Sequence, residues 1–219
     1  TTRCIAISTP WVGIPTAAQR PPRRSMPRPH CTVIGTPAHS RTTSAPNPPV
    51  IARTAAHLSV FQRTPQYAIP ARNRPLDAAF RRDTREQWPQ LRAMMLETLA
   101  GTPFPSPTRS ALEDSPQQRE AVYEEHWQRG GLGVAFGAYA DLMSNAESNE
   151  TLCEFVREKI RRTVHDPNFA RRLLPDYPIG TKRLILDEGY YETYNRSNVT
   201  LVDLRENPII EITPQGVRT

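Results

Sequence analysis

The sequence predicts an α/β fold in which a helical block interrupts the elements of a sheet. The apolar segment 58–61, LSVF, follows a short helical run that starts near Val50, and the pair predicts a helix leading into a buried strand. Mainly helical residues, 77–176, come next, and strand patterns return after Tyr177. A helical block between sheet elements favours an insertion into an α/β domain, although separate α and β domains would give a similar pattern.

The first 49 residues differ from the rest in composition. Ten of the 23 prolines lie in residues 1–50, and the first acidic residue of the chain is Asp77. Proline removes amide donors and blocks both helices and strand ladders. We therefore expect residues 1–49 to be irregular or disordered. Because a Pro- and Arg-rich texture is typical of GC-rich codons read out of frame, we also hypothesise that a shifted reading frame or a wrong start produced this segment.

Capping residues divide the helical block. Asp77 is a candidate N-cap for a helix that Pro89 should interrupt and Gly101 should follow, and Ser115 with Pro116 should open a helix closed by Gly130. Further helices are expected over about 133–143 and 149–164, with a short one from Pro167 to near Leu174. Strands are expected near residues 199–204, 209–213 and from 217 onward.

Charge, cysteines and hydropathy exclude several classes of protein. Residues 1–76 hold ten arginines and no acid, whereas residues 77–219 hold 18 basic and 22 acidic side chains. The basic stretch has no aromatic interleaving and no recognisable helix, so we do not expect nucleic-acid binding. Three distant cysteines fit neither a disulfide framework nor a zinc cluster, and no metal site is expected. Without an apolar span or a signal pattern, we expect a cytoplasmic chain that does not enter a membrane.

The pentapeptide Phe61-Gln62-Arg63-Thr64-Pro65 places an arginine and a threonine just beyond a buried strand. Ligands of open α/β sheets bind at the carboxyl ends of the strands, and an arginine near the end of the second strand suits the 2′-phosphate of NADP. The guanidinium offers a bidentate fork, and the hydroxyl of Thr64 can add a donor. On the pentapeptide alone, a solvated arginine after a strand is the more common outcome.

A second motif, Tyr177-Pro178-Ile179-Gly180-Thr181-Lys182-Arg183, holds two adjacent cations in a loop that contains glycine. A permanently charged guanidinium in a closed flavin site can stabilise a peroxyflavin anion, because charges interact more strongly in a low-dielectric site than in water. Lys182 can hold a cofactor phosphate as a point charge. Without further context, two adjacent basic residues usually form a solvated loop.

Long stretches around both motifs resemble Baeyer–Villiger monooxygenases. The resemblance is carried by residues 57–77, HLSVFQRTPQYAIPARNRPLD, and by residues 173–219, LLPDYPIGTKRLILDEGYYETYNRSNVTLVDLRENPIIEITPQGVRT. The helical stretch between them is also similar, most clearly in KIRRTVHDP at residues 159–167. The resemblance covers about residues 50–219, over three quarters of the chain.

The resemblance implies a fold and a site. It implies an incomplete Rossmann-like NADP-binding domain, with residues 50–76 and 177–219 forming its parts and residues 77–176 forming a helical insertion. Arg63 and Thr64 match residues that hold the NADPH 2′-phosphate, and Lys182 matches a further NADP contact. Arg183 matches the arginine beside the flavin that supports the peroxyflavin.

The same resemblance implies an activity and exposes departures from it. Family members use FAD, NADPH and O2 to insert oxygen next to a ketone carbonyl, giving an ester or lactone through a C4a-peroxyflavin. The glycine-rich fingerprints of the family are missing, and no glycine occurs between Gly35 and Gly101. Because glycines let a backbone approach a pyrophosphate closely, we expect an internal fragment that is inactive alone. The alternative is a noncatalytic nucleotide-binding or helical interaction module.

Overall fold

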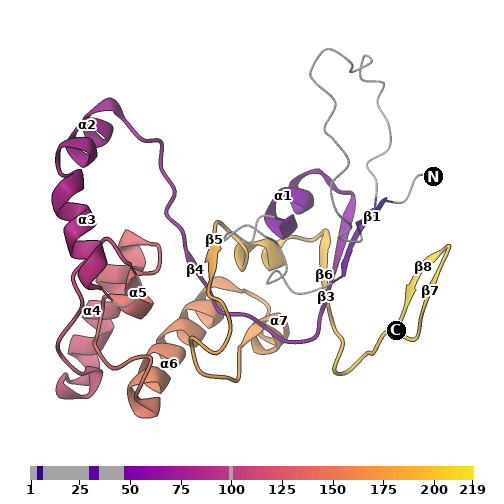
Figure 1. The fold of residues 1–219 in the computed structure, drawn as a ribbon. Coiled ribbons are helices and arrows are strands. Elements are labelled where there is room, and N and C mark those ends of the chain that lie inside the picture. The colour runs from indigo at the N-terminus through magenta and orange to yellow at the C-terminus, as the bar shows by residue number, and fades with distance from the viewer. Residues whose placement is uncertain (1–3, 7–29, 35–46, 99–100) are drawn as a thin grey trace.

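The computed structural model describes residues 4–6, 30–34, 47–98 and 101–219 (Figure 1). A four-stranded sheet in the order β1-β2-β3-β6 forms one side of the molecule, and all of its pairings are parallel. Its strands are β1 (Cys4–Ala6), β2 (His30–Ile34), β3 (His57–Gln62) and β6 (Val199–Asp203). Helix α1 (Asn47–Thr54) leads from β2 into β3, as parallel pairing requires a crossover. The predicted α/β class is confirmed.

Strands β1 and β2 correct the expectation that residues 1–49 are irregular. Both lie inside that segment, and β2 pairs with β3 from His30 opposite His57 to Ile34 opposite Phe61. The residues Thr32, Val33 and Ile34 are β-branched, which favours a strand, and neither strand contains a proline. The density of prolines along the whole segment obscured this local signal. The other residues before Asn47 lie outside the described part of the chain.

The predicted helix starts are confirmed by their caps. Asp77 Oδ1 accepts a hydrogen bond from Phe80 N at 2.7 Å at the start of α2 (Ala78–Glu86), and the helix breaks at Gln87 before α3 (Trp88–Glu97). Ser115 forms a capping box with Gln118 at the start of α4 (Pro116–Arg129), which ends at Gly130. Further helices are η3 (Ala111–Glu113), α6 (Ala146–Thr163), α7 (Pro167–Leu173) and η4 (Glu192–Asn195).

One helix is shorter than expected. The sequence pattern predicted a helix over residues 133–143, but α5 comprises only Gly133–Phe136. Gly137 N closes the last turn on Gly133 O at 2.8 Å, and irregular turns follow. Gly137 lacks the helix propensity to carry the helix further.

Two short strands connect the helical block to the four-stranded sheet, and the sequence analysis missed both. These are β4 (Ala68–Pro70) and β5 (Ile185–Asp187), which pair in parallel and lie between the two halves of the molecule in Figure 1. Strands of three residues carry too little alternation to be predicted. Beyond β6, strands β7 (Glu211–Thr213) and β8 (Gly216–Arg218) form an antiparallel hairpin.

The main core lies where α6 meets β4, β5 and the tyrosine-rich segment that follows them. On α6, Leu152, Cys153, Val156 and Ile160 are fully buried, as their three-to-four spacing predicts. Tyr67, Tyr123 and Tyr190 are among the largest fully buried side chains. Among the described residues, no helix is long and apolar enough to cross a membrane, and no cluster of three potential metal ligands occurs.

Candidate functional site at the edge of the sheet

Arg63 and Thr64 directly follow β3 at the carboxyl edge of the four-stranded sheet. The last residue of the strand, Gln62, is buried opposite Asp203, and its Nε2 donates to Arg172 O at 2.9 Å. This anchoring fixes the point where the chain leaves the sheet. Arg63 is exposed there and makes no hydrogen bond or ion pair with the described residues. An unpaired guanidinium at this edge is available to an anionic ligand.

Arg205, which follows the neighbouring strand β6, is paired with a carboxylate, unlike Arg63. Arg205 Nη2 lies 3.1 Å from Asp203 Oδ2 just after β6. Burial by itself would raise the pKa of Asp203, but the hydrogen bonds from Arg205 lower it overall. Arg205 therefore stabilises the end of β6, whereas Arg63 at the end of β3 is not committed to a carboxylate.

The loop that carries Lys182 and Arg183 is held by a buried amide. Asn149 on α6 donates from Nδ2 to Ile179 O at 2.9 Å and accepts at Oδ1 from Ile179 N at 3.0 Å. Gly180 follows with φ +95°, and a Cβ there would lie 2.7 Å from the Sδ of Met143. The backbone conformation favours glycine, whereas the methionine side chain could move to admit a Cβ. The loop therefore leaves the helical block in a fixed direction.

Three contacts bring this loop beside the segment that follows Arg63. The hydroxyl of Tyr177 lies 3.0 Å from Pro65 O and 2.9 Å from Gln66 Oε1, and Ile185 N donates to Tyr67 O at 3.2 Å. The segments 63–67 and 177–185 thus run side by side into β4 and β5. The two predicted motifs, more than a hundred residues apart in the sequence, lie next to each other.

The cations of the loop differ in their surroundings. Lys182 is half-buried, with its Nζ 4.4 Å from the ring centroid of Tyr177, a cation–π contact. Arg183 is exposed. Neither makes an ion pair with a carboxylate in the part of the chain that the structure describes. Tyr177 belongs to the same motif, but the sequence did not predict a role for it. An aromatic residue close in sequence to two cations is the signal that could have indicated this cation–π contact.

Comparisons with known proteins give a consistent relationship, although no protein-family model matches. A 2-oxo-Δ3-4,5,5-trimethylcyclopentenylacetyl-CoA monooxygenase of Pseudomonas putida is 41% identical over 172 residues, 78% of this chain and 32% of the relative. A Baeyer–Villiger monooxygenase of Pseudooceanicola batsensis is 36% identical over 165 residues, covering 75% of this chain and 30% of the relative. A cyclohexanone 1,2-monooxygenase of Acinetobacter sp. is 36% identical over 169 residues, covering 77% and 31%.

Solved structures agree in fold. The crystal structure of OTEMO in complex with FAD and NADP superposes with a TM-score of 0.81 at 40% identity, covering 86% of this chain and 34% of that one. An oxidised steroid monooxygenase bound to NADP superposes with a TM-score of 0.79 at 43% identity, covering 85% and 35%. The chain is similar to one part of the Baeyer–Villiger monooxygenases. It spans about a third of the length of the relatives it matches.

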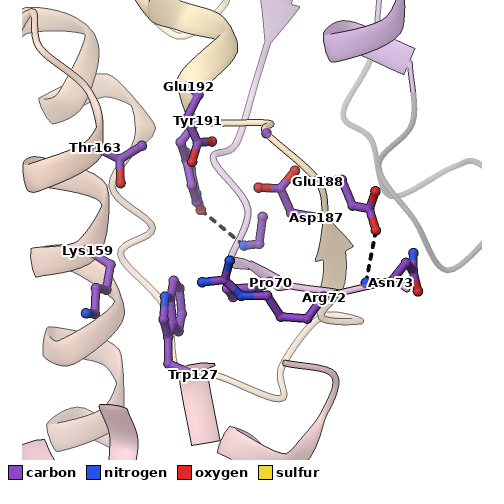
Figure 2. Close-up of a pocket in the computed structure, with 12 residues that line it drawn as sticks. Pro70, Arg72, Asn73, Trp127, Lys159, Thr163, Asp187, Glu188, Tyr191 and Glu192 are labelled. Carbon is purple, nitrogen blue, oxygen red and sulfur yellow. Dashed lines mark hydrogen bonds between the residues drawn. The ribbon is translucent and has the colours of Figure 1, made fainter. Parts of the chain in front are cut away.

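The chain also has a cavity of about 400 Å³ that is lined partly by β4 and β5, shown in Figure 2. Trp127 on α4 and Lys159 on α6 form one wall, and Asp187 and Glu188 at the end of β5 form another. Lys159 is ion-paired with Glu124. Burial raises the pKa of Asp187 to about 7, although its Oδ1 accepts from Tyr190 N at 2.5 Å. The sequence analysis did not single out this carboxylate.

Proposed function

We propose that the chain supplies the NADPH-binding part of a Baeyer–Villiger monooxygenase that uses NADPH and O2 to insert oxygen next to a ketone carbonyl, giving an ester or lactone. The observation that carries the proposal is the pair of uncommitted cations, Arg63 and Lys182, on adjacent segments at the carboxyl edge of a parallel sheet. The relatives whose crystal structures contain NADP support it. They favour this function over a noncatalytic module.

The residues present fit a 2′-phosphate. A phosphate monoester carries about −1.5 to −2 charge at neutral pH, and its oxygens accept charge-assisted hydrogen bonds. Arg63 offers a fork of donors, Thr64 a hydroxyl and Lys182 a point charge, and the two cations have no carboxylate to compete for them within the described residues. We assign these three residues to binding the phosphate that distinguishes NADPH from NADH.

The pairing of β3 with β6 supports the proposed domain boundaries. These strands are adjacent and parallel, although the whole helical block separates them in the sequence. This arrangement supports residues 50–76 and 177–219 as parts of an incomplete Rossmann-like domain, with residues 77–176 as its helical insertion.

FAD requires more than the described residues offer. Arg183 is the residue that we assign to it, and an exposed guanidinium by itself cannot hold a flavin. FAD, when bound, supplies the oxygen-activating chemistry of the reaction. We propose that Arg183 faces the flavin site of the complete protein, where its permanent charge stabilises negative charge that develops during oxygen transfer. It cannot move protons, because arginine stays protonated.

The proposal is tested by titrating the 219-residue chain with 2′,5′-ADP and with 5′-AMP, followed by NMR. We expect tighter binding of 2′,5′-ADP. Arg63→Ala should weaken 2′,5′-ADP by roughly tenfold to a hundredfold, because one charge-assisted contact of about 1.5–3 kcal/mol is lost. Binding of 5′-AMP should hardly change.

The control is Arg92→Ala, which removes an exposed arginine from α3, far from the sheet edge. It should leave both affinities unchanged. Equal affinity of the parent chain for the two ligands would contradict the assignment, as would an equal loss for both ligands in Arg63→Ala.

A further inference from the structure

We propose that Tyr177 is a positioning residue that sets the preference for 2′-phosphorylated nucleotides, because it holds Lys182 beside Arg63 and Thr64. The inference rests on the proposed function and explains how the site would prefer nucleotides that carry a 2′-phosphate. Tyr177 itself does not have to touch the ligand. It joins the two segments that carry the phosphate-binding side chains. Its hydroxyl contacts one segment and its ring contacts Lys182 on the other.

The hydroxyl of Tyr177 anchors the loop to the segment after Arg63. Its oxygen lies 3.0 Å from Pro65 O and 2.9 Å from Gln66 Oε1, so its single proton is shared between two acceptors. Burial raises the pKa of Tyr177 to about 12, and the hydroxyl, like that of an ordinary tyrosine, is a protonated donor at neutral pH. Pro65 directly follows Thr64, so this contact fixes the loop against the first phosphate-binding segment.

The ring of Tyr177 carries the lysine. Lys182 Nζ lies 4.4 Å from the ring centroid, and Tyr67 packs edge-on against the same ring with centroids 5.4 Å apart. A ring held on its edge and at its hydroxyl presents a fixed face to the ammonium. A flexible lysine side chain thereby loses much of its freedom before any ligand arrives, which reduces the entropy lost on binding.

The other anchor of the loop lies immediately next to the glycine. Asn149 binds both the N–H and the carbonyl of Ile179, so the backbone is fixed on the helical side at that residue. Beyond it, Thr181 N donates to Pro178 O at 3.2 Å, which closes the turn, and the Nζ of Lys182 lies over the ring of Tyr177. Tyr177 is therefore the side chain against which the ammonium rests, on a loop fixed at both sides of the glycine.

The charges of Arg63 and Lys182 explain why the position of the lysine matters. The described residues provide no carboxylate partner for Arg63 or Lys182, and holding two like charges on neighbouring segments is unfavourable without an anion. A dianionic phosphate between them would remove that repulsion. Because the 2′-phosphate is the group that NADPH has and NADH lacks, this effect would favour 2′-phosphorylated nucleotides.

The experiment uses the full chain with 2′,5′-ADP and 5′-AMP, followed by ³¹P NMR. Tyr177→Leu removes ring and hydroxyl, Tyr177→Phe keeps the ring face, and Lys182→Met removes the charge. We expect Tyr177→Leu to weaken 2′,5′-ADP about threefold to tenfold and 5′-AMP hardly at all, with a smaller effect for Tyr177→Phe. The bound 2′-phosphate should also titrate at higher pH in Tyr177→Leu, because a nearby cation favours the dianion.

A double-mutant cycle separates positioning from general damage. In the Lys182→Met background, Tyr177→Leu should have no further effect on the ratio of the two affinities. The control, Tyr123→Phe, removes another buried hydroxyl, which contacts Thr151 on α6, and should leave the ratio unchanged. Failure of the parent chain to discriminate between the ligands would overturn the proposed function. Normal discrimination that Tyr177→Leu does not reduce, or reduces equally in both backgrounds, would overturn only the role of Tyr177.

If Tyr177→Leu does not fold, Tyr177→Phe and Lys182→Met still decide the question. The Phe variant retains the packing of the ring, so its cycle with Lys182→Met measures the contribution of the hydroxyl anchor alone. Additive effects of these two substitutions on the affinity ratio would overturn the inference.

Discussion

Two regions of the molecule differ in whether their charged side chains form ion pairs. On α6, Arg162 pairs with Glu158 one helical turn away. Lys159 on α6 pairs with Glu124 on the neighbouring helix α4. Hydrogen bonds from these cations lower the pKa values of both glutamates. Around β4 and β5, by contrast, Arg63, Lys182 and Arg183 have no carboxylate partner in the described residues, and burial raises the pKa of Asp187.

The difference follows from geometry. Helix positions three and four apart are neighbours on one face, so a sequence rich in both signs finds partners along and between helices. Segments that enter and leave short strands have no such repeat. Exposed charges remain hydrated there, and a ligand or a further part of a longer protein can supply the carboxylate or phosphate partner that they lack. We therefore interpret the unpaired region as the functional one.

The largest expected effect concerns Arg183 and needs a relative of complete length. At the position that matches Arg183 in such a relative, substitution by alanine should lower ester formation by about a hundredfold or more, as removal of a preorganised donor does. Reduction of the flavin by NADPH should largely remain, so the rate of reduction and the ester yield are measured separately.

Arg183→Lys is the matched variant for this experiment. It keeps the charge but loses the planar fork, so we expect partial recovery of ester formation. A normal ester yield from the alanine variant would remove Arg183 from the catalytic assignment and would place it with solvated surface arginines.

A second prediction concerns Asp187 in the unpaired region. Its pKa of about 7 in the folded chain lies above the ordinary value for an aspartate, so the folded state retains a proton that the unfolded state loses between about pH 4 and 7. The free energy of unfolding should therefore fall as the pH rises through this window. At about 1.4 kcal/mol per pH unit, the fall is at most about 4 kcal/mol.

Asp187→Asn removes this titration and retains an acceptor for Tyr190 N. Urea unfolding at several pH values should show the variant to be more stable than the parent above pH 7, with the difference shrinking toward pH 4. Parallel stability profiles for the two proteins would show that Asp187 is as well solvated as an ordinary surface carboxylate.

The sequence predicted the helical region better than the region around β4 and β5. The caps at Asp77 and Ser115 and the apolar spacing on α6 are local signals, and the structure bears each of them out. The pairing of β4 with β5 depends on residues more than a hundred positions apart, as does the contact of Tyr177 with Pro65. No local pattern encodes such contacts, so the resemblance suggested the roles of Arg63 and Lys182 without revealing how they are brought together.

The smallest expected effect is found by comparing a paired arginine, Arg157, with an unpaired one, Arg63. The quantity compared is the free energy of unfolding. Arg157 on α6 donates from Nε to Pro175 O at 2.9 Å and from Nη1 to Glu150 at 2.6 Å, and its side chain is 15% exposed. Arg157→Met should lower the free energy of unfolding by about 1.5–3 kcal/mol, because hydrogen bonds to a charged group are lost.

Arg63→Met should change the free energy of unfolding by less than about 0.5 kcal/mol, because the exposed guanidinium has no partner to lose within the described residues. The same variant in the presence of 2′,5′-ADP should lose most of the stabilisation that the ligand gives the parent, since a ligand stabilises only in proportion to its affinity. Urea unfolding with and without ligand measures both quantities. A loss without ligand as large as that of Arg157→Met would mean that Arg63 has a structural partner, and the contrast between the two regions would no longer hold.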